Sequence, residues 1–433
     1  KPEALSYILG NPPFGGKQYQ SDQQKADMAA TFSDVPSAGL LDLVTAWYRK
    51  AADYMAGNPA IKAAFVSTNS INQGEQVGIL WPGLFKRGVK LHFAHRTFQW
   101  SSEAQGKAAV HCVIIGFALH DIEDKRIFDY ETPQAEPHEA KAENINPYLV
   151  DAAQVVLANR RSSIVEAPPI SFGSMPNDGG YLLLSSKEKA ALLAQEPKAA
   201  QWIRKILGSE ELINAKERSC LWLADISPDE LREMPVLLKK IEAVRRYRLA
   251  SMRPNTRDLA AIPTLFGEIR QPKNQYLAIP KTSSERRAYI PIAFLQPNVI
   301  ANTELFTIEG AGLYHFGILS SAMHMAWVRS VCGRLENRYR YSAGIVYNNF
   351  PWPQTATEKQ KQAIADAAQM VLDARAQFPN ASLADLYDPL TMPAELTKAH
   401  HKLDAAVDRA YAKRKFTGDS DRVAFLFELY QQI

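Results

Sequence analysis

Four residues near the start of the chain have a pattern that could carry out chemistry on an amine. Asn11-Pro12-Pro13-Phe14 directly follows a short apolar run over residues 5–9. An asparagine side-chain oxygen and a neighbouring backbone carbonyl can both accept hydrogen bonds from the exocyclic amine of a base. Such bonds aim the amine lone pair at a methyl donor. Proline stiffens the loop, and the aromatic ring can stack on a base that has left the duplex. A proline turn that closes a strand is the alternative interpretation.

The elements expected around this motif alternate between strands and helices. Buried-strand patterns occupy residues 5–9, 61–66, 89–98 and 108–119. Helical spacing of apolar residues covers 40–55, and a second helix over 77–85 contains Pro82, which would shorten or kink it. This order predicts an α/β sheet whose last two strands are antiparallel. The charged, proline-bearing stretch 121–147 is expected to be a linker or a surface excursion.

The chain changes character twice after this region. From about residue 151 it contains many short runs and turn signals, such as Pro168-Pro169. From about residue 355 the spacing becomes helical over 355–378 and 393–413, followed by a short helix over 422–430. We therefore expect three domains, at residues 1–150, 151–354 and 355–433.

Two further segments near the motif could contribute to a site. Gly10 to Lys17 almost matches a phosphate-binding P-loop, but it has one spacer too many, and Gln18 replaces the Ser or Thr. Ser67-Thr68-Asn69-Ser70 follows the strand pattern at 61–66. This segment either borders the crevice at the carboxyl end of the sheet or caps the next helix.

Positive charge is concentrated in the middle of the chain. Five arginines and no acid lie between residues 245 and 257, namely Arg245, Arg246, Arg248, Arg253 and Arg257. The interleaved Tyr247 favours phosphate contacts over a solvated helix face. The polar loop Lys281–Arg287 could present donors to base edges. Further basic candidates for binding DNA, without a distinction between base and phosphate contacts, are Lys107, Lys273, Lys281, Arg286, Arg287, Arg338 and Arg340.

Long stretches of the chain resemble one known family. Asn11-Pro12-Pro13-Phe14 looks like the catalytic motif of DNA adenine-N6 methyltransferases. The MmeI-like (type IIL/IIG) family of combined restriction–modification enzymes is similar over nearly the whole chain. The segments that carry this resemblance are NPPFGGKQYQSDQQKADM (11–28), FVSTNSINQGEQVGILWP (65–82), FAHRTFQWSSEAQGKAAVHCVIIGF (93–117), RYSAGIVYNNFPWP (340–353) and LYDPLTMPAELTKAHHKLDAAVDRAY (386–411).

This resemblance implies a fold and a function. The fold would be the C-terminal half of a class I, Rossmann-like methyltransferase sheet, followed by an α+β target-recognition domain and a C-terminal helical domain. Asn11 and the Pro12 carbonyl would orient the amine, Pro13 would complete the motif, and Phe14 would stack on the flipped adenine. S-adenosylmethionine would be the methyl donor. Its glycine-rich binding loop and a nuclease domain would precede residue 1, so this piece alone should be inactive.

Composition narrows the remaining possibilities. The 433 residues are 46% apolar and 22% charged, and the net charge of 50 − 46 = +4 is too small to indicate a polyanion partner by itself. Three cysteines without a CxxC pattern fit a reducing compartment, here the bacterial cytoplasm, and argue against a disulfide or zinc framework. No apolar run approaches the ~20 residues of a membrane span. The expected partner is double-stranded DNA.

Two rival functions remain open from sequence. One is a DNA-binding specificity module without catalysis, which would fit a piece that lacks the cofactor loop. The other is the modification subunit of a multisubunit restriction system, where recognition is usually a separate chain. The long middle domain in this chain argues against the second.

Overall fold

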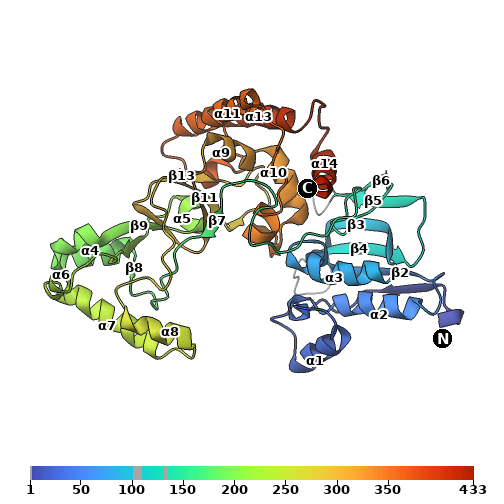
Figure 1. Cartoon of the computed structure of the whole chain (residues 1–433), viewed down its shortest axis with the longest axis horizontal. Coiled ribbons are helices and arrows are strands. Elements are labelled where there is room, and N and C mark those ends of the chain that lie inside the picture. The colour runs from blue at the N-terminus through green and yellow to red at the C-terminus, as the bar shows by residue number, and fades with distance from the viewer. Residues whose placement is uncertain (1, 101–109, 131–134) are drawn as a thin grey trace. The chain divides into compact units, whose positions relative to one another are not determined.

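A computed structural model describes residues 2–100, 110–130 and 135–433. These residues form two compact units, each built from segments that are distant in sequence. The first unit contains residues 1–166, 323–354 and 414–433, and the second contains residues 167–322 and 355–413. Figure 1 labels their helices and strands.

A mixed sheet forms the centre of the first unit. Within the described residues its strand order is β1-β2-β4-β3-β5-β6. The strands are β1 (Tyr7–Gly10), β2 (Lys62–Thr68), β3 (Lys90–Trp100), β4 (Val110–Ala118), β5 (Lys125–Asp129) and β6 (His138–Ala142). β1 and β2 are parallel, while β4 lies between β2 and β3 and runs antiparallel to both. The predicted α/β sheet and its antiparallel β3–β4 pair are therefore confirmed.

Within 121–147, where a linker or a surface excursion was expected, residues 125–129 and 138–142 form strands that extend the sheet. β5 pairs parallel with β3, and β6 pairs antiparallel with β5. Arg126 on β5 forms ion pairs with Asp124, at 2.7 Å, and with Glu139 on β6. One of these pairs, Arg126–Glu139, crosses between neighbouring strands at the edge of the sheet, where charged side chains suit strand geometry.

Helices α2 (Thr45–Met55) and α3 (Glu75–Lys86) pack onto this sheet. The Tyr48 ring of α2 lies 5.3 Å from the rings of both Phe65 on β2 and Phe117 on β4. Pro82 sits inside α3 without ending it. Helix α1 (Asp22–Thr31) was not expected from sequence, because its apolar periodicity is weak and it buries Met28 as its main core contact. It begins at a capping box formed by Ser21 and Gln24.

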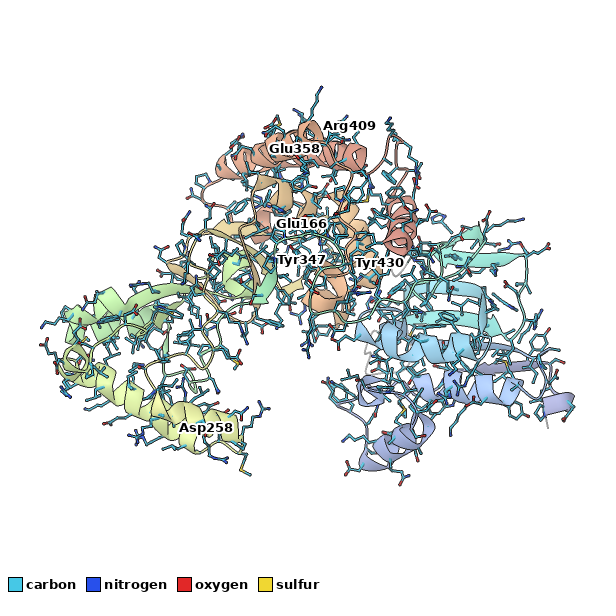
Figure 2. The ribbon with its side chains drawn as sticks, viewed as in Figure 1. Glu166, Asp258, Tyr347, Glu358, Arg409 and Tyr430 are labelled. Atoms are coloured by element: carbon cyan, nitrogen blue, oxygen red, sulfur yellow. The ribbon has the colours of Figure 1, made fainter. Side chains whose placement is uncertain are left out.

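The two late segments of the first unit pack on each other and also contact residues 148–158, where Tyr148 stacks on Phe427 and the Ala158 carbonyl accepts the Asn349 amide. They contribute α10 (Ala322–Val331), β16 (Arg334–Leu335), β17 (Arg338–Arg340), a π-helix (Ala343–Tyr347) and α14 (Asp419–Gln432). The ring of Trp327 on α10 lies 5.3 Å from Phe427 and 6.4 Å from Tyr430 on α14. Tyr430, labelled in Figure 2, donates its hydroxyl proton to the Asn349 side-chain oxygen at 3.1 Å.

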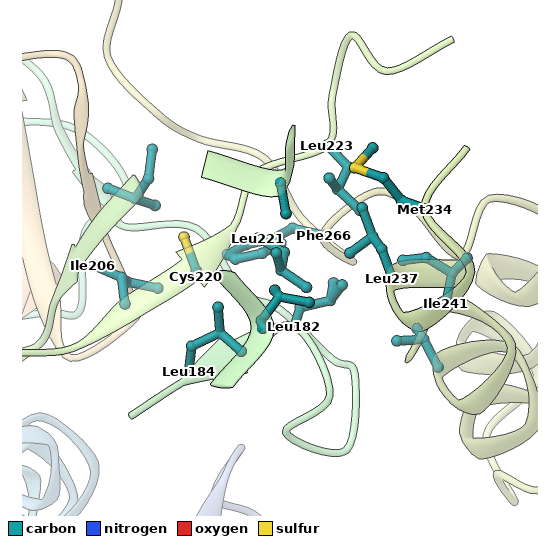
Figure 3. Close-up of a cluster of buried hydrophobic side chains, with 14 residues drawn as sticks. Leu182, Leu184, Ile206, Cys220, Leu221, Leu223, Met234, Leu237, Ile241 and Phe266 are labelled. Atoms are coloured by element: carbon teal, nitrogen blue, oxygen red, sulfur yellow. The ribbon is translucent and has the colours of Figure 1, made fainter. Parts of the chain in front are cut away.

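The second unit is an α+β arrangement. Among the described residues it contains the sheets β14-β9-β10-β8 and β13-β11-β15-β7. Their strands are β7 (Ile170–Phe172), β8 (Leu183–Leu184), β9 (Ile203–Leu207), β10 (Ser219–Leu221), β11 (Tyr276–Pro280), β13 (Ala293–Leu295), β14 (Val299–Ala301) and β15 (Leu305–Glu309). Figure 3 shows the buried cluster in which Leu182, Leu221 and Phe266 meet Leu237 and Ile241 of α7.

Helices complete this unit. They are α4 (Ser186–Gln195), α5 (Ser209–Asn214), α6 (Pro228–Arg232), α7 (Pro235–Leu249), α8 (Pro254–Asp258), α9 (Leu313–Leu319), α11 (Glu358–Ala376), α12 (Leu383–Leu386) and α13 (Ala394–Tyr411). The two long helices predicted after residue 355 are α11 and α13, and they pack against each other. A Cβ on Gly317 of α9 would lie 2.7 Å from Ile364, so glycine permits the close approach of α9 and α11. Among the described helices none is both long and apolar enough to span a bilayer.

Candidate functional site

The Asn11-Pro12-Pro13-Phe14 loop begins directly after Gly10, the last residue of β1. It therefore lies at the carboxyl end of the parallel pair β1–β2, the edge where α/β sheets bind ligands. Asn11 is exposed, Pro12 is buried and Phe14 is half-buried. A pocket of about 510 Å³ opens beside the loop, lined by β1, Asn11 to Pro13, Phe65 and the α2 residues Trp47, Lys50, Ala51 and Tyr54. The buried proline fixes the backbone while the asparagine amide stays accessible.

Hydrogen bonds hold the chain that follows this loop. Gly15 has a φ of +38°, a conformation that favours glycine. Its carbonyl accepts the Leu43 N–H at 2.8 Å and the side-chain amide of Gln20 at 3.1 Å. The buried Gln20 amide also donates to the Leu41 carbonyl at 3.1 Å. The loop is thus anchored to residues 41–43 and has a defined conformation before any ligand binds.

Asp42 connects this anchor to the end of β2. Its carboxylate accepts the Thr68 hydroxyl at 3.3 Å and also the Ser70 hydroxyl, and its backbone N–H donates to the Gln76 side chain at 3.0 Å. These bonds hold the end of β2 to segment 41–43, which is itself bonded to Gly15 and Gln20. Asp42 and Gln20 are positioning residues that sequence reasoning missed, because no motif or spacing separates them from ordinary loop residues.

The segment Ser67–Ser70 lies at the carboxyl end of β2, as one of its two interpretations required. Thr68 precedes the 3-10 helix Asn69–Asn72, but among the described residues its side chain makes no capping hydrogen bond. The Ser67 hydroxyl instead lies 2.7 Å from the buried Tyr48 hydroxyl. Burial raises the pKa of Tyr48, while its bond to Ser67 acts in the opposite direction, so the phenol remains neutral.

Arg248 corrects the expectation that all five arginines of the 245–257 run contact phosphate. It is fully buried, and in the described part of the chain it donates to the backbone carbonyls of Pro176, Asn177, Leu259, Ile262 and Leu265 at 2.7–3.1 Å. Burial lowers the pKa of its guanidinium. The reason is helical periodicity: Arg248 shares the inward face of α7 with Leu237, Ile241 and Val244. That spacing was readable in the sequence.

The other four arginines of the run are exposed. Arg245 and Arg246 lie on the outer face of α7, and Arg253 and Arg257 lie at and within α8, whose last residue Asp258 is labelled in Figure 2. Arg257 donates to the Ser251 carbonyl at 3.0 Å. The Tyr247 ring covers Gly179, where a Cβ would lie 2.8 Å away. The charge run therefore becomes a surface of four arginines at the α7–α8 corner.

The Lys281–Arg287 loop contains residues in different environments. Lys281 lies 3.7 Å from Glu304 and 5.4 Å from the Phe172 ring centre. Residues Thr282–Ser283 form the short strand β12. Arg287 is half-buried, which lowers its pKa, whereas Arg286 is exposed. Arg286 is thus the side chain of this loop that is most available to a ligand.

The remaining basic candidates are dispersed. Lys273 is exposed in the second unit, where its backbone N–H donates to Glu309 at 3.1 Å. Arg338 and Arg340 are exposed on β17 of the first unit, and Arg338 pairs with Glu336 at 2.9 Å. Lys107 lies outside the described residues. Among the residues with described positions, no three His, Cys, Asp or Glu side chains are grouped as metal ligands would be.

Comparison with known proteins gives the same family for all three parts of the chain. Residues 2–129 match the model of the MmeI DNA-methyltransferase domain, residues 151–354 the MmeI target recognition domain, and residues 356–433 the MmeI C-terminal domain. The structure of the Type IIL restriction–modification enzyme MmeI in complex with DNA is 50% identical, with a TM-score of 0.91, over 100% of this chain and 57% of that chain. The chain belongs to the MmeI-like family.

A curated relative agrees with this membership. DNA methyltransferase A of Bacillus subtilis (strain 168) is 39% identical over 428 residues, which are 99% of this chain and 48% of the relative. The chain thus spans about half the length of the MmeI-like proteins that it matches. The present chain has an α/β methyltransferase sheet, an α+β recognition region and C-terminal helices. The predicted fold class is therefore confirmed.

The interior position of Arg248 yields a prediction about stability. Arg248→Met fills the site with an unbranched apolar side chain but leaves the carbonyls that Arg248 contacts without their donor. The free energy of unfolding should therefore fall by about 3 kcal/mol. Urea unfolding followed by tryptophan fluorescence measures this loss, since Trp222 packs on Phe266 in the same core. The matched control Arg245→Met, on the exposed face, should change stability by less than about 0.5 kcal/mol. Equal losses in the two variants would contradict the structural role.

Proposed function

We propose that this chain is the carboxyl-side part of an S-adenosylmethionine-dependent DNA adenine-N6 methyltransferase of a restriction–modification system. It binds a specific duplex site and methylates an adenine flipped out of the helix. The observation that carries the proposal is the loop after β1, whose residues Asn11, Pro12 and Pro13 line a pocket at the carboxyl edge of a methyltransferase sheet.

The loop geometry supports a specific division of work. The exposed Asn11 side-chain oxygen and the Pro12 carbonyl accept the two N–H groups of the adenine amine. Their pull turns the amine lone pair out of conjugation with the ring and towards the methyl carbon. Phe14 stacks on the flipped base and keeps its plane fixed. As the nitrogen–methyl bond would form, the sulfur–methyl bond would break, and the cationic amine would then pass one proton to water. Bound S-adenosylmethionine supplies the methyl group from its sulfonium.

The residues of this chain fit one wall of a cofactor site. Trp47 and Tyr54 expose about a third of their surface beside the pocket, and Tyr7 and Leu9 on β1 are 64% and 74% exposed. β1 is the first strand in the sheet order and pairs with β2 among the described residues. We propose that a preceding segment of the same parent chain covers this apolar edge. That segment would bring the glycine-rich cofactor loop, and a nuclease domain would precede it.

DNA recognition is assigned to the basic surfaces. The four arginines of the α7–α8 corner contact phosphates, since they are exposed and the described residues give them no acidic partner. Arg286 in the Lys281–Arg287 loop reads a base edge, because it is exposed and has a planar fork of donors. Lys273, Arg338 and Arg340 add positive charge.

A specificity module without catalysis is the second candidate function. The exposed apolar edge of β1 favours it for this chain in isolation, because a complete cofactor site would need more residues around that edge. A modification subunit that relies on another chain for recognition fits less well, since residues 151–354 match a target recognition domain.

The first prediction tests the catalytic loop in the complete enzyme. Asn11→Ala should abolish methylation and leave DNA affinity largely intact, because its oxygen acts on the amine only as the methyl group is transferred. Asn11→Asp keeps an acceptor oxygen and should retain more activity. Transfer of radiolabelled methyl groups to DNA and fluorescence anisotropy measure the two properties. Methyl transfer by Asn11→Ala within a few-fold of wild type would exclude the proposed role.

Phe14 provides a companion test of base stacking. Phe14→Ala should cost about 1–3 kcal/mol, which is the loss of one stacking partner. Phe14→Trp preserves a stacking surface and should keep more activity than Phe14→Ala in the same assay. An alanine variant as active as the tryptophan variant would show that stacking is not the role of this ring.

Cofactor affinity tests whether the chain holds half of a site. The isolated chain should bind S-adenosylmethionine weakly or not at all, because the glycine loop and the ribose-binding acid lie elsewhere in the parent. Isothermal titration calorimetry measures this directly. Micromolar affinity for the isolated chain would place the cofactor site within the present residues and contradict the proposal.

The arginine surface is tested through salt dependence. Each change of Arg245, Arg246, Arg253 or Arg257 to Gln should weaken binding to all duplexes alike and flatten the slope of log affinity against log salt by about 0.9. Arg286→Gln should instead cost about 1–3 kcal/mol on the proper site and relax the choice of one base. Arg232→Gln, which removes an exposed arginine paired with Asp229, serves as the control. If the slope of log affinity against log salt is unchanged in all four variants, these arginines do not contact phosphate and form only a solvated surface.

A further inference from the structure

A second pocket lies beside the chain that follows the Asn11–Phe14 loop. Its volume is about 440 Å³, and its lining includes Lys17, Gln18, Gln20, Lys25 and Met28. These residues come from the turn after the loop and from α1, with residues 38 and 39 closing the other side. The catalytic proposal uses none of them, although Lys17 is only six residues from Asn11.

The pocket has fixed walls. Tyr19 N–H donates to the Gly16 carbonyl at 2.8 Å, which closes a turn with Lys17 and Gln18 at its two central positions. Gln20 ends this turn and is held by its bonds to the Gly15 and Leu41 carbonyls. Ser21 then caps α1, and Met28 is buried at the base of the helix. Lys17 and Gln18 therefore project from a turn whose backbone is already ordered.

The charge of the pocket favours an anion. Lys17 is exposed, and no acidic side chain among the described residues pairs with it. Lys25 lies 3.4 Å from Asp22, but both side chains are more than half exposed, so solvent screens this pair strongly. Gln18 adds an amide donor. Two ammonium groups and an amide beside one hollow can all donate hydrogen bonds to a phosphate.

We infer that this pocket binds a backbone phosphate next to the flipped adenine, on the strand that carries it. The inference rests on the proposed function, because it needs an extrahelical base at Asn11. Six extended residues span at most about 20 Å, and the turn at Gly16–Tyr19 shortens this reach further. A flipped base enters the pocket beside Asn11, and a compact ammonium group within this reach of Asn11 can hold a flanking phosphate.

A nucleoside triphosphate is a poorer occupant. The stretch Gly10 to Lys17 lacks the spacing of a P-loop, and Gln18 offers no hydroxyl for a magnesium ion. The site provides a pair of side-chain charges on an open surface, which suits one phosphodiester. Lys17 would then act by holding the backbone in the flipped conformation, not by touching the reacting amine.

The first test uses the salt dependence of DNA binding by the complete enzyme. Lys17→Gln should flatten the slope of log affinity against log salt by about 0.9. Lys86→Gln is the matched control, because Lys86 is an exposed lysine at the far end of α3, away from the carboxyl edge of the sheet. It should leave the slope unchanged. A slope for Lys17→Gln that equals that of wild type overturns the inference, whether or not the enzyme methylates DNA.

The second test locates the phosphate. The methylated site is first read by sequencing DNA from cells that express the enzyme, and duplexes are then made with one neutral methylphosphonate at each position flanking the target adenine. At one position the neutral linkage should lower kcat/KM of wild type about tenfold, as expected for one charged hydrogen bond. Lys17→Gln should lose a similar factor on ordinary DNA and show no further loss at that position.

The outcomes separate this inference from the proposed function. If wild type methylates no site, the methyltransferase proposal fails, and the salt slope still decides whether Lys17 contacts DNA. If wild type is active, the factors lost in kcat/KM decide the contact. If the loss from Lys17→Gln multiplies with the loss from the methylphosphonate at every position, Lys17 does not contact a flanking phosphate. Fluorescence of 2-aminopurine at the target position should rise less in Lys17→Gln than in wild type if the contact supports flipping, and an equal rise would also contradict the inference.

Discussion

The hydrogen bonds of Asp42 and Gln20 are the constraint on which the site depends. Gln20 joins Gly15 to Leu41, and the neighbouring Asp42 carboxylate accepts the hydroxyls of Thr68 and Ser70 at the end of β2. Without these bonds, Asn11 and Pro12 would belong to a flexible connection whose ordering would cost free energy at each turnover. With them, the acceptors for an amine are positioned before the base arrives, which is what electrostatic preorganisation requires. The same anchor orders the turn that carries Lys17.

A second constraint decides which charges can meet DNA. A buried guanidinium is stable only when its donors are satisfied, and Arg248 satisfies them with main-chain carbonyls from residues 176–177 and 259–265. This ties the carboxyl end of α7 to two loops and gives the α7–α8 corner a rigid base. Arg245, Arg246, Arg253 and Arg257 then project from that base with fixed spacing. Arg248, which the sequence suggests as a DNA contact, is therefore a buried residue that supports the four exposed arginines.

The two compact units also change how the domains should be understood. The family models follow the order of the chain, whereas residues 323–354 and 414–433 pack into the first unit beside the methyltransferase sheet. Tyr148 stacks on Phe427, and the Asn349 side-chain amide donates to the Ala158 carbonyl, which attaches these segments to the rest of the unit. Cutting the chain near residue 150 would thus remove aromatic surface from the first unit. The division into three successive domains stays a prediction. The contacts within the structure group the same segments into two units.

The sequence by itself determined the α/β sheet, the long helices α11 and α13, and the position of Asn11–Phe14 after a strand. These features follow from local periodicity and from a motif with a chemical reason for each residue. Only the tertiary structure decided that residues 125–129 and 138–142 are strands, because the Arg126–Glu139 pair is recognisable only once β5 and β6 lie side by side. It alone revealed Asp42 and Gln20, whose roles depend on hydrogen-bond partners up to 34 residues away. The physical reason is that a motif indicates which groups can react. The residues that hold those groups in place are identified only by burial and by long-range hydrogen bonds, which the tertiary structure shows.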